Sequence, residues 1–376
     1  MYFTFYTTRK DQKQITFQDI LLNPYMKLPE INYRLTKVTQ DVDEQYALKY
    51  FNHTDQTLAN ITEDMIVRNK ETFTMNTSEH YSHFEIRKKS DPSKKRPIDA
   101  PDLMLKNAQG ILKTYIEDQL KALPHKAAHA YAENRSTVTA MKMHQKNESK
   151  WFLQLDLSNF FNSINEDFMR KMLSQVYPFP FIPVPIFDSI INLSLLENEM
   201  PQGSVLSPTL SNMVMVPIDH KITETLHNYE HHHYVYTRYA DDITISCKEK
   251  FDKNEILDII KSIFKEFEAP LQINESKTRY GSTAGKNFHL GIILNNHGKN
   301  KSSEMSIGHE KNKRFRAMLF NFCTTGEEWD KHDVQKMLGL ISYYKSIEKP
   351  FIERTIQKYN SKFNIDIMAK AKQLIK

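Results

Sequence analysis

The stretch RYADDITIS, residues 238–246, places two adjacent aspartates between short apolar runs of strand-forming residues. This pattern indicates a β-hairpin that carries both carboxylates at its tip. Two unit charges about 4 Å apart repel each other by roughly 4 kcal/mol at an effective dielectric constant near 20. A bound divalent cation is the usual means of offsetting such repulsion, so we expect a metal site at this tip.

A third carboxylate lies upstream, in the run FLQLDL at residues 152–157. The alternating pattern predicts another strand, and Asp156 stands near its end, where a side chain can lie at the rim of a sheet. Three aspartates on two strands are the minimum set that holds two Mg²⁺ ions for phosphoryl transfer. The sequence therefore predicts a nucleotide polymerase that uses Mg²⁺, with Mn²⁺ as a substitute ion.

The composition favours one large domain built from subdomains. The chain has 376 residues, and 51 lysines and arginines against 46 acidic residues give a net charge of +5. That excess is weak support for a nucleic-acid partner, so the placement of charge matters more than its sum. The two cysteines lack metal-ligand spacing, which excludes a zinc ribbon and a disulfide framework. Because no apolar run approaches the roughly 18 residues of a membrane span, we expect a soluble cytoplasmic protein.

Apolar periodicity predicts alternating helices and strands along the chain. The strongest helical stripe lies over residues 256–267. The run 177–185 contains four prolines, so we expect a rigid connector there rather than a regular helix or central strand. Further helices are expected after residue 101 and over 138–146, 168–176, 204–228 and from about 305, with strands over 79–87 and 288–295.

Three motifs in order carry a resemblance to a known family. DLSNFFNSI (156–164), PQGSVLSPTLSN (201–212) and YADD (239–242) together resemble the reverse transcriptase family over most of the chain. The resemblance implies an α+β right-hand polymerase, in which the palm is an antiparallel sheet packed on helices. It implies the following division: an N-terminal, mainly helical extension (1–75), fingers (76–150), palm (151–300, with a fingers segment about 165–205) and helical thumb (301–376).

The resemblance also implies roles for the carboxylates. Asp156 and Asp241 would coordinate both Mg²⁺ ions, the Leu157 carbonyl would assist, and Asp242 would support the cluster. Lys277, in INESKTRYG, stands where the family carries a lysine that protonates the departing pyrophosphate.

Further positions resemble the family's nucleotide pocket. Phe161 stands five residues after Asp156, where a bulky side chain clashes with a ribose 2′-hydroxyl, which implies use of dNTPs. Gln202 and Gly203 combine a side chain that can bond a nucleotide with a residue that allows close backbone approach. In the basic loop 87–96, one lysine and one arginine would grip the triphosphate. Arg96 is the better candidate arginine because a guanidinium makes forked contacts to phosphate, and either Lys88 or Lys89 is the lysine.

The size of the chain resembles bacterial retron-type and defence-associated reverse transcriptases. FHLGIILNN (288–296) matches the family's primer-gripping hairpin, with Leu290-Gly291 at the turn. Retrons usually carry Asn-Ala-x-x-His before the first aspartate, which TAMKMH (139–144) only approximates, and Val-Thr-Gly where this chain has His289-Leu290-Gly291. These departures favour the defence-associated group.

The expected partners are a structured noncoding RNA template, a DNA primer or product and dNTPs, during phage infection. A second defence protein or a homo-oligomer is a further candidate. Four alternatives stay open: a retron enzyme that makes RNA–DNA hybrids, a template-independent or protein-primed DNA polymerase, an RNA-making polymerase, and a catalytically silent RNA-binding scaffold.

Overall fold

The computed structural model describes residues 2–3, 15–16, 56–88, 91–229, 233–283, 288–295 and 304–375. The protein mixes helices with antiparallel sheets, which confirms the predicted α+β class at that level. Most of the predicted helical extension, residues 1–75, lies outside the described residues. Its described elements are the strand pair β1 (Tyr2–Phe3) and β2 (Ile15–Thr16) and the helices α4 (Gln56–Arg68) and α5 (Lys70–Phe73).

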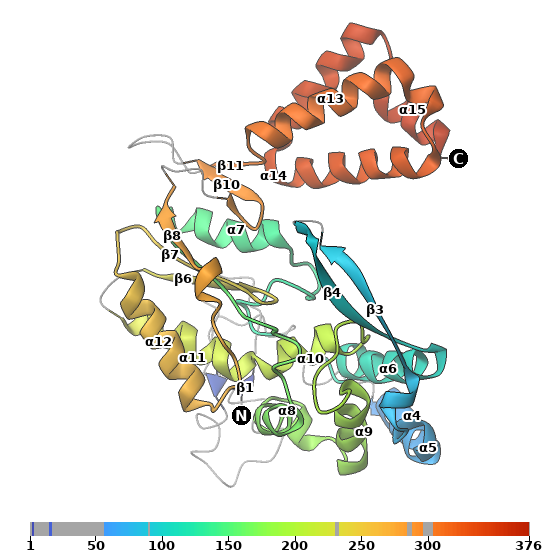
Figure 1. Ribbon diagram of the computed structural model, residues 1–376, viewed down its shortest axis with the longest axis vertical. Helices are drawn as coiled ribbons and strands as arrows, with labels where there is room; N and C mark the ends of the chain where they lie inside the picture. The colour runs from blue at the N-terminus through green and yellow to red at the C-terminus, as the bar shows by residue number, and fades with distance from the viewer. Residues whose placement is uncertain are drawn as a thin grey trace.

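A four-stranded antiparallel sheet lies at the centre of the molecule (Figure 1). Its strands, in spatial order, are β6 (Val235–Tyr239), β7 (Asp242–Cys247), β5 (Trp151–Asp156) and β8 (Arg279–Ser282). The register of β5 and β7 sets Asp156 directly opposite Asp242. Because opposite residues of an antiparallel pair project to the same side, both carboxylates lie on one face of the sheet.

Helices cover the other face of this sheet (Figure 1). Leu153 and Ile245 are fully buried there, in the larger of two hydrophobic cores. The covering helices are α10 (Ser207–Val214), α11 (Val216–Asn228) and α12 (Lys253–Glu266). The stripe predicted for α12 is confirmed, since Ile256, Ile260 and Ile263 are buried in the same core.

Helix α7 (Thr137–Lys146) covers the carboxylate-bearing face at its far end. The ring of His144 is buried between strands β6 and β7, where its nitrogens bond the hydroxyls of Thr237 (2.8 Å) and Ser246 (2.6 Å). Burial lowers the pKa of His144 well below its usual value, so the ring is neutral. The last residue of TAMKMH therefore anchors α7 to the two strands that lead to and from the YADD turn.

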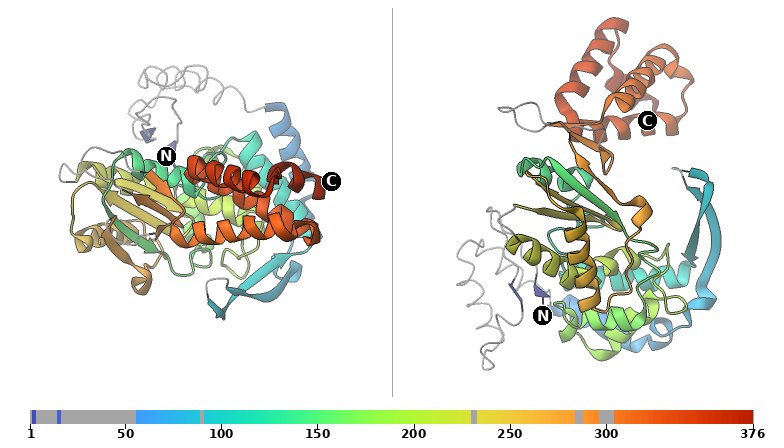
Figure 2. Two further views of the ribbon diagram at one scale, coloured as in Figure 1. Left: turned by 90° about the horizontal axis from the view of Figure 1, so that it is seen from above. Right: turned by 60° about the vertical axis from the view of Figure 1, so that its left-hand side comes forward.

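A long hairpin stands beside the sheet (Figure 2). Its strands are β3 (Tyr81–Lys88) and β4 (Asp91–Pro101), and helix α6 (Leu103–Thr114) follows at its base. Two further helices, α8 (Glu166–Leu173) and α9 (Val184–Ser194), pack against each other. Helix α9 begins at Val184, inside the proline-rich run 177–185. The expectation that the four prolines of this run exclude a helix was therefore wrong for the last two residues of the run. Pro185 occupies the first turn of α9, where a missing N–H donor leaves no intrahelical bond unmade.

The C-terminal helices form a bundle on the α7 side of the sheet (Figure 1). The bundle consists of the helices α13 (His309–Thr325), α14 (Lys331–Phe363) and α15 (Ile367–Leu374). A small sheet precedes it in the chain, formed by β9 (Phe288–His289), β10 (Ile292–Asn295) and β11 (Glu304–Ser306). The strand expected over 288–295 is a hairpin that turns at Leu290-Gly291, where both residues have positive φ. The second hydrophobic core includes Phe152 of β5 and Met141 of α7, so it joins the bundle to the central sheet.

Short helical turns complete the described elements: Thr77–His80, Tyr115–Gln119, Phe179–Phe181, Glu275–Lys277 and Gly326–Glu328. Within the described ranges, every helix is too short or too polar to cross a lipid bilayer.

Candidate active site

The turn between β6 and β7 brings the three predicted carboxylates together. Asp241 and Asp242 follow Ala240, whose φ of 57° lies in the left-handed region that a tight turn requires. The Leu157 backbone N–H donates a hydrogen bond of 3.0 Å to the Asp241 carbonyl, which ties the end of β5 to the turn. All four predicted metal-binding residues therefore lie at one end of the sheet.

A buried ion pair supports this turn from below. The guanidinium of Arg238 is fully buried and makes forked contacts to Asp219 of α11, the shortest at 2.7 Å. The hydroxyl of Tyr236 donates to the same carboxylate at 2.6 Å. The remaining arm of Arg238 donates to the Ala240 carbonyl at 3.2 Å. A charged residue such as Arg238 in a buried strand indicates a buried partner of opposite charge. Nothing in the sequence identifies Asp219 of α11 as that partner.

Burial, with the charge of neighbouring carboxylates as a second cause, raises the pKa of both YADD aspartates. Desolvation by the surrounding protein, followed by the charges of Asp241 and Asp156, raises the pKa of Asp242 to about 6 although its side chain reaches solvent. The pKa of Asp241 is also raised, first by burial and then by Asp156, whereas Lys277 and Arg96 oppose the shift. The cluster therefore carries more negative charge at neutral pH than its surroundings compensate.

This cluster fits divalent cations. Its donors are carboxylate oxygens, the ligands that Mg²⁺ prefers, and they stand on neighbouring strands that a packed core holds in register. The pKa values of Asp241 and Asp242 are raised by desolvation and then by neighbouring carboxylates, and a cation bound there would favour the ionised forms of both side chains.

An ammonium group already partly neutralises the cluster. Lys277 Nζ lies 2.8 and 2.9 Å from the two carboxylate oxygens of Asp156. Its short helical turn is fixed to β5, because the Asn274 N–H donates to the Asp156 carbonyl at 2.8 Å. The structure thus brings the predicted Lys277 into direct contact with the first predicted metal ligand.

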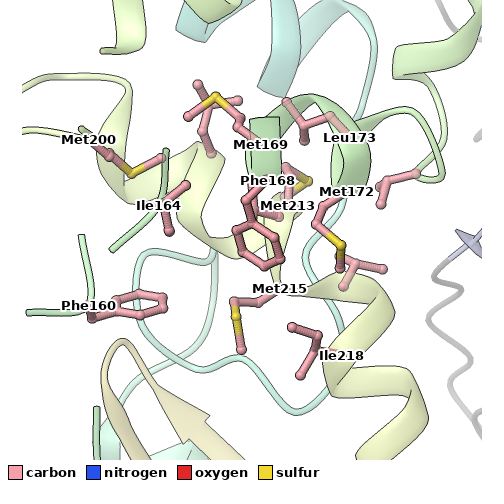
Figure 3. Close-up of a cluster of buried hydrophobic side chains, with 14 of the residues drawn as sticks. Phe160, Ile164, Phe168, Met169, Met172, Leu173, Met200, Met213, Met215 and Ile218 are labelled. Carbon is pink, nitrogen blue, oxygen red and sulfur yellow. The ribbon is translucent and has the colours of Figure 1, made fainter. Parts of the chain in front are cut away.

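Phe161 is the less buried of two adjacent phenylalanines. Phe160 is buried in a methionine-rich cluster that includes Met169, Met213 and Met215 (Figure 3). Phe161 is half-buried, at the edge of the same core. Its ring lies 5.5 Å from that of Phe160, measured between centroids. The packing of one ring therefore orients the next.

The Gln202-Gly203 turn packs against strand β4. The Gln202 carbonyl accepts a 2.8 Å hydrogen bond from the Asp99 N–H, and its side chain lies 3.4 Å from the Asn162 amide oxygen. Gly203 has a φ of +137°, and a Cβ there would lie 2.3 Å from the Asp99 carbonyl oxygen. The close backbone approach expected at this glycine exists, and β4 is the segment that approaches.

Strand β4 also carries Arg96 toward the carboxylates. Arg96 is exposed, lies opposite Ile86 in the hairpin, and contributes a positive charge that lowers the pKa of Asp241. The Lys88 side chain and all of Lys89 lie outside the described residues.

A pocket of about 240 Å³ extends from the carboxylates along the same sheet face. Gln154 lies opposite both Thr244 and Arg279, so the three form a row across the sheet. At a strand rise of about 3.3 Å per residue, this row stands about 7 Å from Asp156, two residues away. Leu290, at the β9–β10 turn, also lines the pocket.

Comparisons with known proteins show which family this chain is similar to. The profile of the family "Reverse transcriptase (RNA-dependent DNA polymerase)" matches residues 86–318. The retron Ec83 reverse transcriptase of Escherichia coli is 29% identical over 250 residues, 62% of this chain and 74% of the relative. The retron Ec86 reverse transcriptase, also of Escherichia coli, is 24% identical over 296 residues, 78% and 85% of the two chains. A solved structure of apo telomerase from Candida tropicalis aligns with a TM-score of 0.37 and 11% identity over 75% of this chain and 70% of that one.

Proposed function

The chain belongs to the reverse transcriptase family, with distant homology to bacterial retron enzymes, and we propose that Asp156, Asp241 and Asp242 form its metal-dependent catalytic centre. One observation carries the proposal: these carboxylates converge at one end of a sheet, and each of the last two has a raised pKa. The reaction is the addition of dNTPs to a primer paired with an RNA template.

Asp156 and Asp241 would hold two Mg²⁺ ions, with the Leu157 carbonyl as a further ligand and Asp242 as support. When bound, Mg²⁺ favours ionisation of the primer 3′-hydroxyl and neutralises charge on the triphosphate. Lys277, which contacts Asp156 in the metal-free protein, would be the group that gives a proton to the departing pyrophosphate. The contact of Lys277 with Asp156 supports this assignment, because it places the ammonium beside the reacting groups.

Residues around the carboxylates would bind the incoming nucleotide. Arg96 grips the triphosphate from β4, with Lys88 or Lys89 as the second cation. Gln202 contacts the nucleotide from the turn that packs on β4, and Gly203 permits that packing. Phe161 closes the space that a ribose 2′-hydroxyl would need, which selects dNTPs.

The elements suit a right-hand polymerase. The β3–β4 hairpin and residues 76–150 would be the fingers, with a further segment over about 165–205. The sheet and its helices within 151–300 would be the palm, and the bundle within 301–376 the thumb (Figure 2). Residues 1–75 would be a mainly helical N-terminal extension.

The pocket beside the carboxylates is suited to the primer end. Its row of Gln154, Thr244 and Arg279 lies about one nucleotide step from Asp156, and Arg279 offers a guanidinium to a phosphodiester. The β9–β10 turn would hold the primer against this row. Helix α13 fixes that turn, because Lys311 donates a hydrogen bond to the Gly291 carbonyl.

A dedicated noncoding RNA is the proposed template, and anti-phage defence the proposed role. Retron-type synthesis of an RNA–DNA hybrid is the second candidate, favoured by the retron relatives and by the anchoring role of His144 in TAMKMH. The departures in the same element and at 289–291 favour the first candidate.

One experiment tests the reaction and separates the candidates. Protein purified with its bound RNA is incubated with Mg²⁺ and labelled dNTPs, and the product is digested with DNase or RNase and sequenced. We expect labelled DNA complementary to one co-purifying RNA. DNA joined covalently to RNA would select the retron candidate, and DNA attached to protein would select protein priming. Absence of labelled DNA, with phage survival unchanged by Asp241→Asn, would select the silent scaffold.

A further inference from the structure

Tyr131 lies beside the catalytic centre on a loop to which the sequence analysis assigned no role. Its side chain is 51% exposed, and its φ of 54° is in the left-handed region. A residue other than glycine adopts this conformation at a free-energy cost of about 1–2 kcal/mol. Such a conformation persists only where the surroundings hold it.

The loop is held by two elements of the candidate site. Its backbone pairs with strand β6, since the His129 N–H donates to the Arg238 carbonyl at 2.8 Å and the Arg238 N–H donates to the Ala127 carbonyl at 2.7 Å. The side-chain amide of Asn212, in α10, donates to the Ala130 carbonyl at 2.8 Å. Tyr131 is therefore fixed by the strand that leads to YADD and by the end of the PQGSVLSPTLSN motif.

These anchors direct the ring of Tyr131 toward Phe161. The two ring centroids are 6.3 Å apart with planes tilted by 49°, within the range of favourable aromatic contacts. Desolvation raises the pKa of the Tyr131 hydroxyl, and the nearby charges of Asp241 and Arg96 act on it in opposite directions. The Tyr131 side chain thus contacts Phe161 and lies close enough to Asp241 and Arg96 to be influenced by their charges.

The arrangement gives Phe161 a support on each side. Phe160 holds it from the core, at 5.5 Å between ring centroids, and Tyr131 contacts it from the solvent side. A side chain that excludes a hydroxyl group by its position is effective only if it cannot move to another rotamer. The buried side cannot supply that restraint alone, because Phe161 is only half-buried.

We propose that Tyr131 is a specificity-determining residue that holds Phe161 against the sugar of the incoming nucleotide, so that deoxyribonucleoside triphosphates are selected over ribonucleoside triphosphates. The proposal rests on the proposed function of this site. It makes Tyr131 a positioning residue that acts through its ring, so its hydroxyl is dispensable for sugar selection.

The test compares kcat/KM for dCTP and CTP in primer extension on an RNA template. We expect Tyr131→Ala to lower the preference for dCTP by about 10-fold, mainly through faster use of CTP, while kcat/KM for dCTP changes by less than about 3-fold. Tyr131→Phe keeps the preference of the natural chain. Tyr343→Ala, which removes another partly exposed tyrosine from α14, leaves the ratio unchanged.

The double variant Tyr131→Ala with Phe161→Ala tests whether Tyr131 affects sugar selection through Phe161. If Tyr131 acts through Phe161, Phe161→Ala lowers the preference and Tyr131→Ala adds nothing to it. Equal losses with dCTP and CTP in Tyr131→Ala, or a Tyr131→Phe variant as permissive as Tyr131→Ala, would overturn the proposal. A natural chain that makes no DNA would instead overturn the proposed function, so the two failures are distinguishable.

Discussion

At the scale of single residues, Asp242 links protonation of the site to stability. Its pKa rises from the usual 3.8 to about 6 in the folded protein. The folded state therefore binds more protons than the unfolded state between about pH 4 and pH 6, and this group destabilises the metal-free protein increasingly as pH rises through that window.

We expect Asp242→Asn to stabilise the metal-free protein at pH 7.5 by about 1 kcal/mol, a value discounted because the side chain reaches solvent. The gain should shrink as pH falls from about 6 to 4 and disappear below about pH 3, where the natural carboxyl is protonated in both states. Denaturant unfolding in EDTA across this pH range measures it, with Asp258→Asn on the exposed surface of α12 as the control. A variant less stable than the natural chain at pH 7.5 would contradict the electrostatic account.

Gly203 gives a second prediction at this scale. A Cβ at this position would lie 2.3 Å from the Asp99 carbonyl oxygen, on a backbone with φ of +137°. We expect Gly203→Ala to reduce stability by about 2–4 kcal/mol through strain and overpacking, and to raise KM for dNTPs because β4 also carries Arg96.

Gly339→Ala in α14 is the matched control, since an added Cβ there meets no atom within 4 Å. In a helix interior this change is neutral or stabilising by up to about 1 kcal/mol. Equal behaviour of the two alanine variants in thermal unfolding and in KM would show that the β4 contact is unimportant.

At the scale of secondary-structure elements, the Arg238–Asp219 pair joins the β6–β7 hairpin to α11. Both side chains are fully buried, and Arg238 also holds the Ala240 carbonyl at the turn. Asp219→Ala leaves a buried, unpaired guanidinium, so we expect a loss of about 3–5 kcal/mol in the free energy of unfolding.

Replacing both partners separates stability from function. The double variant Arg238→Met with Asp219→Leu should regain part of the stability, since an apolar pair of similar volume removes the unpaired charge but leaves the buried Tyr236 hydroxyl without its acceptor. Primer extension should stay reduced, because the hydrogen bond to the Ala240 carbonyl is lost. Full recovery of both properties would show that the turn does not need Arg238.

Local sequence patterns predicted helices and strands correctly where the apolar residues recurred at a regular spacing. The helix at α12 and the strand ending at Asp156 followed from spacing alone, because each buries one consistent face. Prolines were harder to interpret. Pro185 begins α9, and the helix expected over 204–228 is two helices that meet at Met215, with Pro217 in the first turn of the second. A proline marks a helix boundary, but the local sequence does not show whether a helix ends or begins there.

Long-range contacts lay beyond the reach of the sequence. The convergence of Asp156 with the YADD aspartates was predictable because both strands carry a motif. The partner of Arg238 in α11 and the approach of Tyr131 to Phe161 were not, since each joins segments with no shared local signal. Such contacts depend on strand order and helix packing, which spacing along the chain does not encode.

At the scale of the whole molecule, two hydrophobic cores meet along β5. The larger core supports the sheet that bears the carboxylates, and the smaller holds the C-terminal bundle. Phe152 belongs to the smaller core, whereas Leu153, the next residue, belongs to the larger. The strand that ends at Asp156 therefore couples both bodies to the candidate site.

The central claim is that this carboxylate cluster performs DNA synthesis on RNA. The most direct measurement is Mg²⁺-dependent primer extension on an RNA template by the natural chain, Asp156→Asn, Asp241→Asn and the control Asp258→Asn, all with matched thermal stability and template binding. We predict extension by the natural chain and the control, and a loss of at least about 10³-fold in both cluster variants. Extension by Asp241→Asn at the rate of the natural chain would contradict the account.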